Sequence, residues 1–196
     1  MRNRFALLAL TAAVAVSAAA CSGPPTGGGT PGQTSTAAAS TVPTLPPRPR
    51  EIDLTGVDVC SLLTPEQQQE LGIDRPPTAG VDTDGHRNTY CDYRHSLSSP
   101  RFGYQVTIVG QEDASLYLTG ERNVVSRVVS AAGFPAVQAR RPTDERGCFV
   151  LVSTKDGQYF DVQYGESTGS NDTPEVACEK ARVTAEMAMQ TLLTQR

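Results

Sequence analysis

The chain has 196 residues, of which 38% are hydrophobic and 19% charged, and its 17 basic and 21 acidic residues give a formal net charge of −4. An acidic chain is a poor candidate for binding nucleic acid or for electrostatic adhesion to anionic lipids. We therefore expect no nucleic-acid partner.

The N-terminus has the features of a secretory signal peptide. Arg2 and Arg4 form a short positive segment, residues 5–16 are apolar, and small residues at 18–20 are tolerated beside a signal-peptidase cut. The apolar segment is too short and wrongly flanked for a transmembrane helix, and no later run approaches 18 apolar residues. We interpret residues 1–20 as a lipoprotein signal peptide.

Cys21 follows directly, and a small-residue run ending in cysteine resembles the lipobox of bacterial lipoproteins. Five cysteines is an odd number, which lipidation of Cys21 would explain. Several acyl chains on one residue would anchor the protein stably to a membrane. Ala18 stands where the lipobox favours leucine, so a soluble secreted protein is the alternative.

Composition divides the rest of the chain into a linker and a domain. Residues 22–50 are almost wholly Ser, Thr, Gly, Pro and Ala, which cannot bury enough apolar surface to become ordered. We therefore expect a lipidated cysteine and disordered linker over residues 21–51. Residues 52–196 then form a single globular domain, long enough to bury roughly two thirds of its unfolded surface.

Capping residues and alternation predict the first elements of this domain. Thr64, Pro65 and Gly72 are the cap, the first helical residue and the stop of a short helix. Residues 89–95 and 102–110 alternate between apolar and polar side chains, so both are predicted strands.

The later elements follow from the same signals. Within residues 121–137, the four valines at positions 124, 125, 128 and 129 favour a strand, although their spacing also fits a helix. Asp156-Gly157 separates two strand-like runs as a hairpin turn, and residues 148–152 are apolar on both faces, as in a central strand. Thr173 caps a C-terminal helix with a stripe of small residues. The order predicts an α+β fold, with an antiparallel sheet packed against a short N-terminal and a longer C-terminal helix.

Cys60, Cys91, Cys148 and Cys178 lie in a chain with an export signal, where disulfides persist. Pairing Cys60 with Cys91 and Cys148 with Cys178 joins a strand to the start of a helix twice over similar spans, and we favour this pairing. The chain contains no C-x-x-C motif, the spacing typical of metal-binding or redox-active cysteines. We therefore predict no cofactor and no metal.

Several motifs together resemble a known family. They are Cys60 to Pro65 followed by Gly72, Cys91-Asp92-Tyr93, Gly133 to Ala136, and Cys148 with a closing helix at Cys178. This pattern is similar to the actinobacterial lipoproteins that carry the domain of unknown function 3558. The resemblance implies a cell-surface lipoprotein with two disulfides, and it implies no activity or catalytic residue.

Two sequence patterns give weak indications, one of a catalytic serine and the other of a zinc site. Residues 165–169 match G-x-S-x-G, but the helix does not follow Ser167 at once, as a nucleophile elbow requires. We expect a flexible loop there, with a small serine hydrolase as an unfavoured alternative. His86 and His95 resemble zinc ligands only if Cys91 is free, which the predicted disulfide excludes.

Two features are candidates for binding. The aromatic side chains of the predicted sheet are either core residues or the lining of a ligand pocket under the small-residue helix; they are Tyr93, Tyr104, Phe134, Phe149 and Phe160. Arg140, Arg141 and Arg146 lie in one polar segment, which is either a solvated loop or a docking patch for an anionic partner.

The expected protein is thus a non-enzymatic binding or accessory module, lipid-anchored on the outer face of the cytoplasmic membrane. Its partner would be an apolar small molecule or a protein of the cell envelope. A purely structural or assembly role is the remaining alternative.

Overall fold

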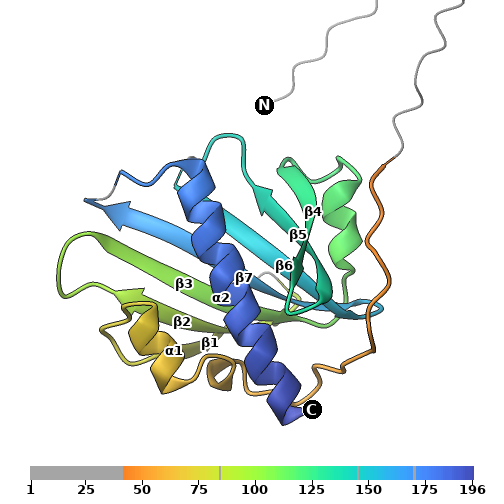
Figure 1. Cartoon of the computed structure of the whole chain (residues 1–196), viewed down its shortest axis with the longest axis horizontal. Helices are drawn as coiled ribbons and strands as arrows, with labels where there is room; N and C mark the ends of the chain where they lie inside the picture. The colour runs from red at the N-terminus through yellow and green to blue at the C-terminus, as the bar shows by residue number, and fades with distance from the viewer. Residues whose placement is uncertain (1–41, 84, 145, 170) are drawn as a thin grey trace, which may run out of the picture. The chain divides into compact units, whose positions relative to one another are not determined.

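A computed structural model describes residues 42–83, 85–144, 146–169 and 171–196. Within them, seven antiparallel strands form one sheet in the spatial order β1-β2-β3-β7-β6-β5-β4 (Figure 1). The strands are β1 (Thr78–Val81), β2 (Thr89–His95), β3 (Arg101–Val109), β4 (Val125–Ala131), β5 (Phe134–Arg140), β6 (Gly147–Lys155) and β7 (Gln158–Thr168). The helices are η1 (Val59–Ser61), α1 (Pro65–Glu70), η2 (Ala114–Leu118) and α2 (Pro174–Gln195), η denoting 3₁₀ helices.

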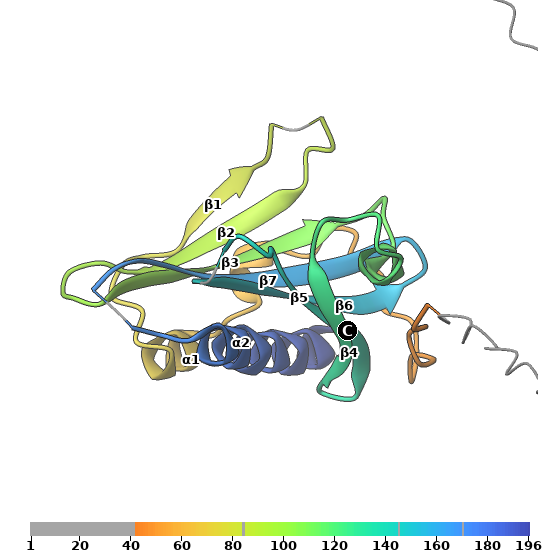
Figure 2. The same ribbon diagram turned by 90° about the horizontal axis from the view of Figure 1, so that it is seen from above.

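The long helix α2 covers one face of the sheet, where it packs mainly on β6 and β7 (Figure 2). Thr173 caps it, and its side chain accepts a hydrogen bond from the Val176 amide at 3.4 Å. Small side chains line the face turned to the sheet: Ala177, Ala181, Ala185 and Ala188 are each 0% exposed. Because these side chains are small, the helix lies close to the strands. The space between the helix and this face of the sheet is filled by a hydrophobic core.

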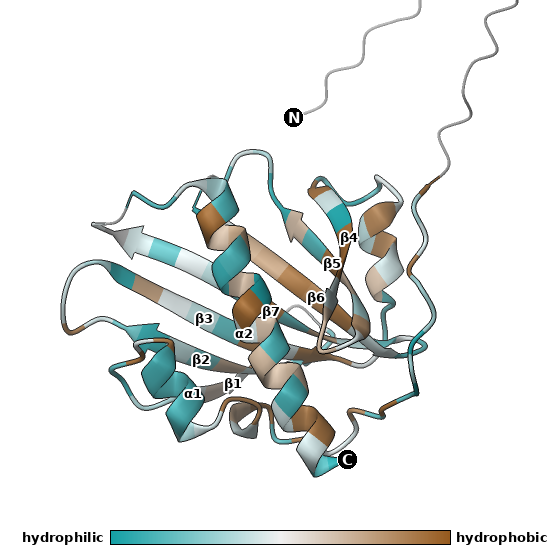
Figure 3. Cartoon of the chain, viewed as in Figure 1, coloured by the Kyte–Doolittle hydropathy of each residue, from teal (hydrophilic) through white to brown (hydrophobic). Residues whose placement is uncertain are grey.

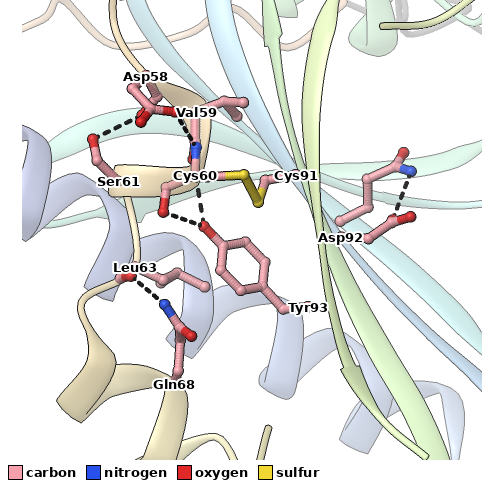
Figure 4. Close-up of a disulfide and its surroundings, with 10 residues drawn as sticks. Asp58, Val59, Cys60, Ser61, Leu63, Gln68, Cys91, Asp92 and Tyr93 are labelled. Carbon is pink, nitrogen blue, oxygen red and sulfur yellow. Dashed lines mark hydrogen bonds between the residues drawn. A yellow bond between two sulfur atoms is a disulfide. The ribbon is translucent and has the colours of Figure 1, made fainter. Parts of the chain in front are cut away.

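Helix α1 and the preceding turn cover the β2 end of the same face. Thr64 and Gln67 form a reciprocal capping box at the start of α1. The Cys60–Cys91 disulfide ties this segment to β2, and the Tyr93 hydroxyl donates a hydrogen bond to the Cys60 carbonyl at 3.1 Å (Figure 4). A covalent and a polar contact therefore hold the same loop against the sheet.

The opposite face has a second, smaller core over β5 and β6. Leu118 of η2 packs there with Val137, Leu151 and Tyr159. Figure 3 shows β6 as largely hydrophobic, which agrees with a strand covered on both faces. The prediction of a central strand over residues 148–152 is therefore confirmed.

Residues 42–51 belong to the folded domain, which corrects the expected boundary at residue 52. Leu45 packs against the second core. The Arg48 guanidinium donates to the Ser153 hydroxyl at 2.9 Å and forms an ion pair with Asp156. Ile52 and Leu54 then enter the main core. Composition indicated a linker here because proline dominates the segment, but these contacts are made to residues about a hundred positions away in sequence.

The main elements expected from the sequence are present. The short and long helices, the strands at residues 89–95 and 102–110 and the hairpin at Asp156-Gly157 are all formed. The ambiguous residues 121–137 contain β4 and the start of β5, so the strand interpretation is confirmed. The loop expected at residues 165–169 is wrong, because β7 continues to Thr168. Both favoured disulfides are formed, Cys60–Cys91 and Cys148–Cys178.

Among the described helices, none combines the length and the apolar composition that crossing a membrane requires. The signal peptide and Cys21 lie outside the described residues.

Removing the Cys148–Cys178 disulfide should lower the free energy of unfolding by about 3–4 kcal/mol, because the bridge closes a loop with a sequence separation of 30. The double variant Cys148→Ala/Cys178→Ala would be compared with the native protein by urea unfolding. Cys60→Ala/Cys91→Ala is the matched comparison, since its separation of 31 predicts a similar loss. A loss below about 1 kcal/mol in both would contradict this account.

Candidate functional site

The sheet face opposite α2 carries a trough of about 610 Å³. Figure 2 shows the β1–β2 hairpin curving away from α2 on one side of this face. The floor is formed by β3 and β7, and the walls by the β1–β2 hairpin and the segment through η2. Its lining is largely polar, in contrast to the sealed core beneath α2.

Strand alternation places the floor residues. Phe160 and Val162 of β7 point into the core, so Asp161 between them points to the trough. Thr107 of β3 is the register partner of Asp161. The next row of the floor pairs Val109 with Tyr159. The same two strands therefore supply the core on one face and the trough on the other.

One wall is aromatic and carries a fixed ion pair. The Tyr117 and Tyr159 rings meet edge to face with centroids 6.4 Å apart. The Tyr159 hydroxyl donates to the Glu112 carboxylate at 2.9 Å, and Arg122 pairs with the same carboxylate. The Arg122 guanidinium also lies 5.4 Å from the Tyr117 ring centre. Burial raises the pKa of both tyrosines, so their hydroxyls stay protonated.

The other wall is the β1–β2 hairpin. Gly80 lies in register with Tyr90 across the two strands. A Cβ atom at Gly80 would overlap the Tyr90 ring, so glycine lets this ring lie across β1. At the turn, the Gln111 side chain donates to Asn88 Oδ1 at 2.9 Å and to the His86 carbonyl at 3.3 Å. These bonds join the turn to the segment leaving β3.

Asp161 is the unusual residue of the floor. Its Oδ1 atom is shielded from solvent and has no hydrogen-bond partner among the described residues. Burial raises the pKa of Asp161 to about 7, although a hydrogen bond from the Thr107 hydroxyl opposes the shift. A carboxyl group that changes charge near neutral pH in a cavity is typical of a functional site. Sequence reasoning missed it, since an acid at an outward-facing strand position is normally solvated.

The five aromatic residues, which the sequence leaves as either core or pocket lining, do not all line one cavity in the described structure. Four of them lie in the core cluster under α2 and are 0–4% exposed: Tyr93, Tyr104, Phe134 and Phe160. Phe149 packs on the opposite face against Tyr117. The small stripe of α2 brings the helix so close that the large side chains fill the space beneath it.

Ser167 and His95 line the same cavity of about 400 Å³, but each side chain has other hydrogen-bond partners. The Ser167 hydroxyl donates to the Arg101 carbonyl at 3.2 Å, while the His95 ring contacts the Gly72 carbonyl and the Ser98 hydroxyl. His86 lies at the trough, and Ser167 is about 25 Å along β7 from Tyr159 at the trough end. The zinc pattern is not assembled, because Cys91 is in a disulfide, and His86 precedes β2 whereas His95 is the last residue of that strand.

Two other charged regions lie outside the trough. At the far end of β7, Lys180 pairs with Asp172 and donates to the Tyr164 hydroxyl at 3.1 Å, and burial raises the pKa of nearby Glu166. Arg140 ends β5, and Arg141 and Arg146 are exposed in the following segment. Within the described residues, no group of three or more His, Cys, Asp or Glu side chains is placed to hold a metal ion.

Comparison with protein families gives a match to the model described as "Protein of unknown function (DUF3558)", over residues 16–191. The chain belongs to the DUF3558 family. The match spans the whole sheet and both disulfides of this DUF3558 protein, and it includes Cys21. Neither the curated proteins nor the solved structures give a significant match.

The raised pKa of Asp161 predicts a specific dependence of stability on pH. Between about pH 4 and pH 7 the folded protein keeps a proton on Asp161 that the unfolded chain has lost. The contribution of Asp161 to the free energy of unfolding therefore falls as pH rises through this window, by on the order of 2–4 kcal/mol.

Asp161→Asn removes this titration. Relative to the native protein, the variant should gain stability between pH 4 and pH 8 when both are unfolded in urea. Asp156→Asn is the control, because Asp156 lies outside the trough and its side chain is exposed. A stability difference for Asp161→Asn that stays constant with pH would refute the burial of this charge.

Proposed function

We propose that this DUF3558 protein is a lipid-anchored binding module on the outer face of the cytoplasmic membrane, and that it holds a small polar molecule in the trough. The observation that carries the binding role is a cavity of about 610 Å³ with a shielded, unpartnered carboxylate oxygen at its floor. Ligand sites in proteins are typically concavities of 300–1,000 Å³ with a few converging polar groups.

The polar lining changes the expected ligand class. An apolar small molecule was expected from the aromatic residues of the sheet, but those fill the core. The trough instead offers the side chains of Asp82, Asn88, Gln105 and Thr107 alongside tyrosine rings. A ligand with several hydrogen-bonding groups fits this lining better than a hydrocarbon does.

The membrane location is supported by sequence. A charged start, an apolar segment and small residues precede Cys21, and the family match begins at residue 16 and so includes this cysteine. A binding role is preferred to a hydrolytic one because Ser167 and His95 have other hydrogen-bond partners. An actinobacterial lipoprotein is the protein class that fits these features.

The anchor is tested by replacing Cys21. Cells expressing the native protein should incorporate an alkyne-labelled fatty acid into it, and the protein should sediment with membranes. Cys21→Ser should lose the label and most of the membrane fraction, whereas Ser22→Ala should keep both. Unlabelled native protein recovered from the medium would show a secreted protein without an anchor.

The bound molecule is tested by a native mass spectrum of protein extracted gently from its own membranes. A reproducible additional mass that is lost on denaturation is the expected result. Thr107→Phe should remove this mass by filling the floor, whereas Thr89→Phe places the same ring at an exposed position outside the trough. A spectrum that shows only the acylated chain would contradict a ligand-binding role.

A further inference from the structure

Asp161 places a carboxyl group in the lining of the trough, and its Oδ1 atom has no hydrogen-bond partner among the described residues. No ion pair of the described residues includes Asp161. Burying a carboxylate without a cationic partner is unfavourable by several kcal/mol in general. A charge in this position is therefore stabilised by any cation that enters the cavity.

The other charged groups of the lining do not neutralise Asp161. They are Asp82, His86, Glu112 and Arg122. Arg122 is held by its ion pair with Glu112 and by the face of Tyr117. Asp82 adds a second carboxylate at the β1–β2 turn, where its Oδ1 accepts from the Asn88 amide at 3.1 Å. The three carboxylates thus outnumber the one permanent cation, which favours a positively charged ligand.

Tyrosine rings stand beside this charge. Tyr159 neighbours Asp161 on the outer face of β7, one row along the floor, and Tyr117 packs edge to face with it. Aromatic faces attract ammonium groups, and carboxylates accept their N–H donors. The terminal torsion of an aspartate is broad, so Oδ1 can turn toward a bound donor at little cost.

We propose that the trough recognises a protonated amine, whose ammonium group forms an ion pair with Asp161 between the tyrosine wall and Thr107. This inference rests on the proposed binding function and names the ligand class. A divalent metal is a poorer fit, because the described residues offer too few ligands around Asp161. The volume of about 610 Å³ accommodates an amine that carries further polar groups, such as an amino sugar.

The test uses matched probes that differ in the amine alone. Glucosamine would be compared with glucose, and n-butylamine with n-butanol, by following the amide NMR signals of the full-length protein at pH 7. We expect each amine to bind at least about tenfold more tightly than its neutral partner, with shifts at Thr107 and Asp161. In Asp161→Asn the preference should fall below about twofold, whereas Asp156→Asn, at an exposed position outside the trough, should keep it.

The pH dependence gives a second readout. Deprotonation of Asp161, with its pKa of about 7, should raise the affinity for n-butylamine, which stays protonated, up to about tenfold from pH 6 to pH 8. His86 also lines the trough. Any rise that survives in Asp161→Asn is therefore assigned to other groups and not to the proposed ion pair.

The outcomes separate the two proposals. If a ligand mass is found in the native spectrum but amines show no preference over their neutral partners, the amine inference fails and the binding function stands. Equal amine preference in native protein and Asp161→Asn also overturns the inference. If the native spectrum shows no ligand and none of the four probes shifts the trough signals, both proposals fail.

Discussion

A single long helix can cover only one of the two broad faces of the sheet, and the rest of the structure follows from this constraint. The alanine side of α2 lies close to β6 and β7, and the Cys148–Cys178 disulfide fixes its first turns against the sheet. Nothing comparable in the described residues covers the other face. Residues 42–51 and the 3₁₀ helix η2 cover its apolar part over β5 and β6, and the polar part over β3 and β7 stays open as the trough.

This division makes the floor of the trough a rigid surface. Every outward residue of β3 and β7 alternates with a core residue, and both strands are paired on either side. A ligand would therefore meet side chains that are already placed, which reduces the entropy lost on binding. The walls of the trough can adjust to a ligand more easily than the floor can. They consist of the β1–β2 turn and the segment through η2, which are loops and short elements held by side-chain hydrogen bonds.

Much of the fold could be predicted because its elements carry local signals. The capping box at Thr64, the cap at Thr173 and the turn at Gly157 each specify a boundary within a few residues. The site could not be predicted in this way. It depends on β3 and β7 being neighbours, although some fifty residues separate Thr107 from Asp161 in sequence. The Pro-rich residues 42–51 were misassigned for the same reason, since Arg48 finds its partners in the distant β6–β7 hairpin.

Asp161 marks the boundary between the two halves of the outer face. In the row of side chains that crosses the sheet at this point, Leu151 lies on the apolar side and Thr107 on the polar side. A neutral side chain would satisfy the packing here, so the fold itself does not require a carboxylate. Buried acids of this kind lower stability in the empty protein, and any ligand that compensates the charge returns part of that free energy. Occupancy of the trough by the proposed ligand would therefore be coupled to the stability of the domain through a single residue, and tight binding of a cation would be expressed as increased resistance to unfolding.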